Sequence, residues 1–255
     1  MSTLFTGISE LRTVSERGTL NDAAIIAQSG TIAWVGPAAE APAADEKVDL
    51  GGRAVLPGWV DSHTHMVFDG DRSAEFEARI SGGSYEAGGI AVTMDATRQA
   101  GTDRLDKLVA DRVAAGRRGG TTTFETKTGY GLNTESEVEA AKVASRHVDD
   151  VTFLGAHLVP PGADAEDYLD EVVGPMLEGV APYVQWIDVF CERGAFNEEQ
   201  SRRVLEAGKK LGLGLRVHGN QLGEGPGVAL AVELGAASVD HVNHLTDEDV
   251  ELLAN

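Results

Sequence analysis

Two histidines separated by a single residue form the most suggestive motif of the chain for chemistry. His63 and His65 end the run PGWVDSHTH, residues 57–65. In an extended segment, residues i and i+2 point to the same side, so both imidazoles can approach one ion. Imidazole is a good ligand for Zn²⁺ and for Fe²⁺. Two polar residues at the end of a strand would give the same pattern, so the motif alone leaves both interpretations open.

Three more of the seven histidines also stand at the ends of predicted strands: His157, His218 and His241. Any one of them alone is compatible with a structural histidine. The carboxyl ends of parallel strands meet at the same edge of a sheet, and barrel enzymes carry their catalytic groups there. Five histidines at such positions therefore predict one shared site. Lys127 follows a predicted strand as well, and it is either functional or a solvated surface residue.

The elements that position these side chains alternate regularly between strands and helices. Apolar runs around a Ser-Gly turn predict a β-hairpin at residues 23–36. From Ala54 onward the pattern is strand then helix, which indicates a parallel sheet. The predicted strands are 54–60, 121–126, 151–156, 185–190, 213–217 and 238–241. The predicted helices are 103–118, 135–147, 165–181, 197–211 and 227–234.

Six such units favour a (β/α)-barrel over a doubly wound sheet, because no glycine-rich dinucleotide fingerprint follows the first strand. An eight-stranded barrel takes ~250 residues, and this chain of 255 residues begins its first barrel strand only at Ala54. We predict an α/β fold: an incomplete TIM-type barrel over residues 54–255, after a small β-sandwich portion over residues 1–53. A helical pattern reaches Asn255, so we expect further strands beyond it.

Composition narrows the possible partners and the compartment. Asp and Glu number 41 against 21 Lys and Arg, and the formal charge of −20 argues against nucleic acid or an anionic membrane surface as a partner. The single cysteine, Cys191, excludes an internal disulfide and fits a reducing compartment. We expect a cytoplasmic protein. Its acidic, lysine-poor composition is compatible with a salt-rich cytoplasm, where ions screen self-repulsion.

The histidine motif resembles that of the amidohydrolase superfamily, and four further stretches narrow the resemblance. They are VFDGDR at 67–72, KTGYGL at 127–132, FLGAHLVPP at 153–161 and DVFCE at 188–192. Together, in this order, they resemble the imidazolonepropionase family. The resemblance covers residues 54–255, and the first 53 residues resemble the β-sandwich half of such enzymes.

The resemblance implies a metal-dependent hydrolase that opens the ring of 4-imidazolone-5-propanoate to give N-formimidoyl-L-glutamate in histidine degradation. One divalent metal, Zn²⁺ or Fe²⁺/Fe³⁺, is expected on three histidines: His63, His65 and His218. Two residues are expected beside the reacting atoms: His241 and Gln221. Four are expected to contact the substrate: Arg72, Tyr130, His157 and Tyr85.

The resemblance also suggests a homodimer with a small-molecule substrate, and it implies a metal-coordinating Asp on the eighth barrel strand, beyond Asn255. Two alternatives stay open at this point. One is another amidohydrolase that acts on a different cyclic amide or on an aminated ring. The other is a non-catalytic chain that binds metal or a partner at its open strand edges.

Overall fold

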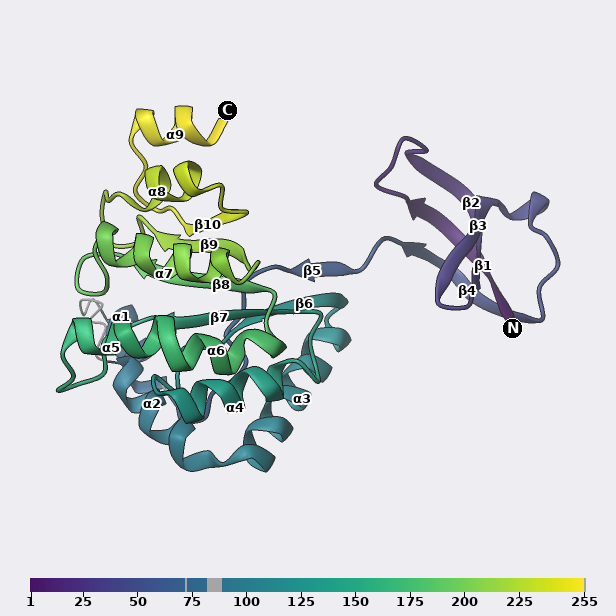
Figure 1. Cartoon of the computed structure of the whole chain (residues 1–255). Helices are drawn as coiled ribbons and strands as arrows, with labels where there is room; N and C mark the ends of the chain where they lie inside the picture. Colours follow the sequence, from purple (N-terminus) through teal and green to yellow (C-terminus); the bar gives the residue numbers. More distant parts are fainter. Residues whose placement is uncertain (72, 82–88, 255) are drawn as a thin grey trace. The chain divides into compact units, whose positions relative to one another are not determined.

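The computed structural model describes residues 1–71, 73–81 and 89–254, and it divides the chain into two compact units, Met1–Trp59 and Val60–Asn255. The first unit is a four-stranded sheet in the order β3-β2-β1-β4 (Figure 1). Its strands are β1 (Ser2–Arg12), β2 (Thr19–Gln28), β3 (Thr31–Pro37) and β4 (Glu46–Val55), with a 3₁₀ turn at Ala38–Glu40.

The predicted hairpin is confirmed as β2 and β3, which pair antiparallel with Ile25 opposite Val35. Ser29 and Gly30 connect them, and both have positive φ, 51° and 79°. Two left-handed residues in a two-residue turn match the twist of the strands that they join. Ile8 and Leu11 of β1 pack beside this hairpin in a small apolar core.

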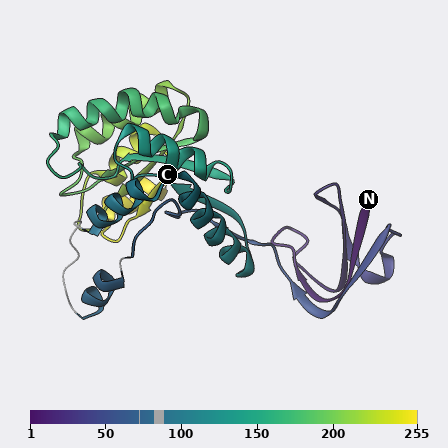
Figure 2. The ribbon, with the colours of Figure 1, turned by 90° about the horizontal axis from the view of Figure 1, so that it is seen from below.

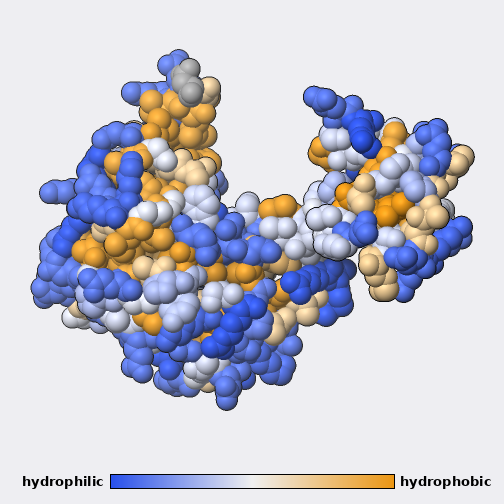
Figure 3. Space-filling view, turned by 45° about the vertical axis from the view of Figure 1, so that its right-hand side comes forward, coloured by the Kyte–Doolittle hydropathy of each residue, from blue (hydrophilic) through white to orange (hydrophobic). Residues whose placement is uncertain are grey.

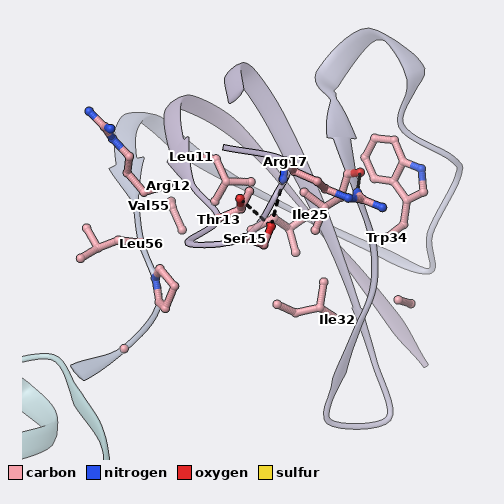
Figure 4. A pocket seen from close by; sticks show the side chains of 14 residues that line it. Leu11, Arg12, Thr13, Ser15, Arg17, Ile25, Ile32, Trp34, Val55 and Leu56 are labelled. Atoms are coloured by element: carbon pink, nitrogen blue, oxygen red, sulfur yellow. Dashed lines mark hydrogen bonds between the residues drawn. The ribbon is translucent and has the colours of Figure 1, made fainter. Parts of the chain in front are cut away.

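The first unit also contains an apolar groove of about 570 Å³ (Figure 4). Leu11, Ile25, Ile32 and Trp34 line it, and the guanidinium of Arg17 donates a hydrogen bond to the carbonyl of Val35 at 2.8 Å. No histidine, cysteine or carboxylate is among its described lining residues, so this groove lacks the groups that the predicted chemistry needs.

The second unit is built on a six-stranded sheet in the order β10-β9-β8-β7-β6-β5, so that neighbours in the sheet are neighbours in the chain. The strands are β5 (Trp59–Asp61), β6 (Thr121–Lys127), β7 (Asp150–Ala156), β8 (Trp186–Cys191), β9 (Gly214–Gly219) and β10 (Ser238–His241). The pairs from β6 to β10 are parallel. With helices between its strands and open edges at β5 and β10, this is the incomplete barrel that the alternation predicts.

The predicted first barrel strand, residues 54–60, is wrong in its extent. Ala54 and Val55 end β4 and pair with β1 of the first unit, and β5 begins only at Trp59. Pro57 and Gly58 separate the two strands. Proline has no N–H to donate to a strand ladder, so the continuous apolar run conceals a break between the two sheets.

The helices of this unit are α1 (Ser73–Ile80), α2 (Gly89–Ala100), α3 (Thr102–Arg118), α4 (Thr134–Ala144), α5 (Ala165–Glu171), α6 (Leu177–Val180), α7 (Glu198–Lys210), α8 (Gly227–Leu234) and α9 (Asp247–Ala254). Asn197 caps the start of α7: its side chain accepts from the Gln200 N–H, and the Gln200 side chain accepts from the Asn197 N–H.

The single helix predicted for residues 165–181 is broken. A π-helical segment, Val172–Met176, separates α5 from α6, and a 3₁₀ turn, Ala181–Tyr183, follows. Gly174 has non-helical angles, φ −106° and ψ −111°, directly before Pro175. Proline lacks the N–H that the helix ladder requires and restricts the residue before it, which explains the break.

The helices form the outer layer beside the strands (Figure 2). The core between them includes Val109 of α3, Phe153 of β7 and Leu205 of α7, all fully buried. Hydrophilic residues cover much of the outer surface, and apolar side chains gather over α8 and α9 (Figure 3), where Val232 and Val250 are exposed. Within the described residues, no helix has the length and apolar character that crossing a membrane requires.

Candidate metal centre

The sheet brings four of the predicted histidines to one place. His63 and His65 follow β5, His218 lies near the end of β9, and His241 is the last residue of β10. One ring nitrogen from each of His63, His65 and His218 lies within 4.8 Å of the other two. The Nε2 atoms of His63 and His65 are 3.3 Å apart. Because these strands are parallel, their carboxyl ends deliver the three imidazoles to the same edge.

The donor atoms of this three-histidine centre fit a metal ion. His65 Nδ1 and His218 Nε2 are buried and have no hydrogen-bond partner among the described residues. Buried polar atoms are normally satisfied, so these unpaired imidazole nitrogens indicate a missing partner. Burial lowers the pKa of His65 well below its usual range, as do the neighbouring His157 and His218. A neutral imidazole is the form that binds a metal.

Two carboxylates lie behind the histidines, and the sequence did not point to either of them. Asp240 Oδ2 accepts a hydrogen bond from His63 Nδ1 at 2.9 Å, and Asp188 Oδ2 lies 2.9 Å from His218 Nδ1. A carboxylate beside Nδ1 holds the ring proton there and leaves Nε2 as the donor to a metal. Asp188 stands in the DVFCE stretch and Asp240 directly precedes His241, but neither position alone indicates a contact with a histidine.

Lys127 joins these carboxylates into one network and is not a solvated surface residue. Its side chain is fully buried, and its Nζ lies 3.0 Å from Asp188, 3.2 Å from Glu125 and 3.3 Å from Asp240. Burial by itself lowers the pKa of Lys127, but the three carboxylates outweigh it and raise that pKa above its usual value. The lysine is therefore charged, and it neutralises part of the negative charge of these three carboxylates.

Replacing Asp240 with asparagine should weaken metal binding, because the carboxylate that orients His63 is lost. Changing such an outer partner typically lowers metal affinity by about 10- to 100-fold. Competition with a chelator for Zn²⁺ measures the loss, with the exposed Asp247→Asn as the matched control. Equal affinities in the two variants would show that Asp240 does not support the centre.

Tyr130 and His157 lie beside the centre. The His157 ring stacks on His65 with centroids 5.6 Å apart, and the Tyr130 ring lies 5.7 Å from His65 and 5.5 Å from His157. His157 Nδ1 is hydrogen-bonded to the Gly129 carbonyl at 2.9 Å. The predicted substrate contacts Arg72 and Tyr85 lie outside the described residues.

The two residues expected beside the reacting atoms have different surroundings: His241 lies beside two histidines of the centre, and the backbone of Gln221 contacts Glu192 and Asn243. The His241 ring lies 4.9 Å from His218 and 5.2 Å from His63, between centroids. Partial burial and these two neighbours lower the pKa of His241 to about 4. Gln221 has no side-chain hydrogen bond among the described residues; its N–H donates to Glu192 at 2.9 Å and its carbonyl accepts from Asn243 at 3.3 Å.

No family model matches the chain, but curated proteins match it over nearly its whole length. The chain is 64% identical over 259 residues to the imidazolonepropionase of Micrococcus luteus, which covers 99% of this chain and 65% of that protein. It is 52% identical over 263 residues to the imidazolonepropionase of Streptomyces coelicolor, covering all of this chain and 67% of that protein. The chain belongs to the imidazolonepropionase family. It spans about two thirds of the length of these relatives.

Solved structures agree with this family in fold. The structure matches a Xaa-Pro dipeptidase with a TM-score of 0.66 at 16% identity, covering 100% of this chain and 64% of that one. It matches an amidohydrolase with a TM-score of 0.65 at 17% identity, covering 100% and 64%, and the guanine deaminase of C. acetobutylicum with a TM-score of 0.64 at 14% identity, covering 100% and 65%. At these identities the likeness establishes the amidohydrolase fold of this imidazolonepropionase-family chain and nothing finer.

Proposed function

We propose that the protein hydrolyses the cyclic amide C–N bond of 4-imidazolone-5-propanoate and releases N-formimidoyl-L-glutamate, a step in histidine degradation. The observation that carries the proposal is the three-histidine centre with Tyr130 and His157 at its side. Curated relatives named imidazolonepropionase, at 52–64% identity to this chain, support the same substrate.

In this proposal His63, His65 and His218 hold one metal ion, Zn²⁺ or Fe²⁺/Fe³⁺. When bound, such an ion lowers the pKa of water and acts as a Lewis acid toward a carbonyl. Asp188 and Asp240 keep His218 and His63 in the orientation that binds it. The protein thus presents preformed ligands to the ion rather than ordering them on binding.

The remaining residues bind the substrate and move protons. His241, with its pKa of about 4, is neutral at pH 7, so it can donate a hydrogen bond to the ring carbonyl or accept a proton. Gln221 cannot be a general base, because an amide does not titrate in this range, so its role is to hydrogen-bond the substrate. Tyr130, His157 and Tyr85 contact the ring and its side chain, and Arg72 offers the propionate a bidentate fork.

The proposal also covers the two domains, the compartment and the assembly of the protein. Residues 1–59 contribute part of a β-sandwich domain, and residues 60–255 form the hydrolase barrel; the boundary lies after the predicted residue 53 because Ala54 and Val55 pair in the first sheet. The single cysteine fits a cytoplasmic enzyme, and the acidic composition argues against nucleic acid or an anionic membrane as a partner of this small-molecule hydrolase. A homodimer is the assembly that the family resemblance favours.

The test is turnover by the complete natural protein loaded with Zn²⁺ or Fe²⁺. The absorbance of imidazolonepropionate should decay, and mass spectrometry should find N-formimidoyl-L-glutamate as the product. The metal-free protein is the control and should be inactive. Hydrolysis of another cyclic amide or of an aminated ring, with imidazolonepropionate untouched, would contradict the proposal, and so would metal binding without any turnover.

A further inference from the structure

Glu137 is a buried acid whose side chain is hydrogen-bonded to residues between 128 and 132. It lies in the first turn of α4, its side chain is fully buried, and no lysine or arginine forms an ion pair with it among the described residues. It accepts from the backbone N–H groups of Gly129 at 2.9 Å, Gly131 at 2.7 Å and Leu132 at 2.9 Å. Burial raises the pKa of Glu137, and these N–H donors together with the Thr128 side chain oppose that rise.

The carbonyl groups of the same loop are bound by other side chains. Arg98 of α2 donates from Nε to the Gly131 carbonyl at 2.6 Å and from Nη2 to the Leu132 carbonyl at 2.9 Å. The Gly129 carbonyl is the one hydrogen-bonded to His157 Nδ1. We call residues 129–132 the clamped loop, because its N–H groups and its carbonyls are both held by side chains.

Close packing leaves this loop little freedom to take another shape. Gly129 has φ +104°, and a Cβ at this position would lie 2.5 Å from the Leu154 carbonyl oxygen. A Cβ at Gly131 would lie 2.6 Å from the Cβ of Ser136. Tyr130 thus lies between two positions at which the tight path of the backbone accommodates only glycine.

We infer that Glu137 is a positioning residue of the substrate pocket. By holding the clamped loop, it directs Tyr130 toward the three-histidine centre and fixes which ring nitrogen of His157 carries the proton. A carbonyl can only accept, so the Gly129 carbonyl places the His157 proton on Nδ1. In the neutral ring Nε2 is then the acceptor. Glu137 touches neither the substrate nor the metal, and it acts through the loop. The link to substrate rests on the proposed function, whereas the link to His157 does not.

Glu137→Gln is the sharpest test, because glutamine keeps the shape but turns one acceptor into an NH₂ group that faces backbone N–H donors. We expect kcat/KM for imidazolonepropionate to fall by about 10- to 100-fold, mainly through KM, as for other losses of positioning. Zn²⁺ stoichiometry should stay the same. Glu135→Gln, an exposed acid in the same turn of α4, is the matched control and should change nothing.

Arg98→Met provides a second route if Glu137→Gln does not fold, because Arg98 lies at the surface and holds the loop through its carbonyls. It should also raise KM and leave metal binding intact. An unchanged KM in either folded variant would overturn the inference, and so would a loss of metal equal to the loss of activity.

The His157 tautomer gives a readout that needs no substrate. In ¹⁵N-histidine NMR spectra of the metal-loaded wild type, we expect a protected Nδ1–H signal that disappears in His157→Gln. In Glu137→Gln and Arg98→Met this signal should broaden or shift. If the wild type does not turn over imidazolonepropionate, the proposed function fails, and this signal alone decides the inference: the same signal in wild type and variants would refute it.

Discussion

Replacing His218 with alanine should abolish tight metal binding and lower turnover of imidazolonepropionate by at least about 10³-fold. His218 is buried and supplies one of the three ring nitrogens that lie within 4.8 Å of one another. Its loss leaves two ligands for an ion whose Lewis acidity and activated water contribute several kcal/mol to the reaction, and each 1.36 kcal/mol corresponds to a factor of ten in rate. Metal analysis after dialysis and a turnover assay measure the two effects.

The matched control is His244→Ala, which removes an exposed histidine a few residues past β10. The hydrogen bond that His244 makes to Asn220 comes from its backbone N–H and survives the change. This variant should keep both metal and activity. A His218→Ala protein that retained one tightly bound metal and normal turnover would show that the chemistry takes place elsewhere.

Replacing Lys127 with methionine should destabilise the fold by about 3–5 kcal/mol, the range seen when one member of a buried ionic network is removed. Methionine nearly fills the volume of the lysine side chain, so the loss of stability measures the effect of removing the positive charge. Asp188, Glu125 and Asp240 would be left with Arg216, whose Nη1 lies 3.4 Å from Glu125, as the nearby cation. Urea unfolding measures the change in the free energy of unfolding.

The Lys127 effect should depend on pH. Burial tends to raise the pKa of Asp188, but His218 and Lys127 lower it well below its usual range. A depressed carboxyl pKa stabilises the fold above the unfolded-state value of about 3.9, and this contribution is lost as the pH falls through the folded-state value. The difference between wild type and Lys127→Met should thus be largest near pH 7 and shrink in acid.

Lys107→Met is the control for losing a lysine, because its ion pair with Asp111 is exposed, and such pairs contribute little. Equal free energies of unfolding for Lys127→Met and Lys107→Met at pH 7 would mean that the buried network does not need its lysine.

The arrangement of the histidines could be predicted from the sequence because it follows from a repeating rule. His157, His218 and His241 each end a predicted strand, and strands joined by helices run parallel, so their ends meet. Lys127 obeys the same rule, yet nothing local distinguishes a lysine that enters a buried network from one that turns to solvent. Glu125 lies on the same strand, but Asp188 and Asp240 come from two other strands, and the assembled sheet brings them to Lys127.

The errors in the fold have local causes of the same kind. The apolar pattern of residues 54–60 is continuous, but Pro57 and Gly58 end one sheet before the other begins. In residues 165–181 the helical periodicity continues through Gly174 and Pro175, where the backbone breaks. In both segments the apolar residues recur as a strand or a helix requires. Proline and glycine nevertheless end the element there, because of the backbone conformations that they adopt. The clamped loop could not be predicted, since Glu137 looks like any acidic residue of a helix N-terminus.

The most direct test of the metal centre is an anomalous-scattering map from crystals of the natural protein loaded with Zn²⁺, with data collected on both sides of the zinc absorption edge. We predict one strong peak within bonding distance of His63, His65 and His218, with Lys127 still between Asp188 and Asp240. A peak bound instead by Asp188 and Asp240, or no peak at the histidines in zinc-saturated crystals, would contradict the account.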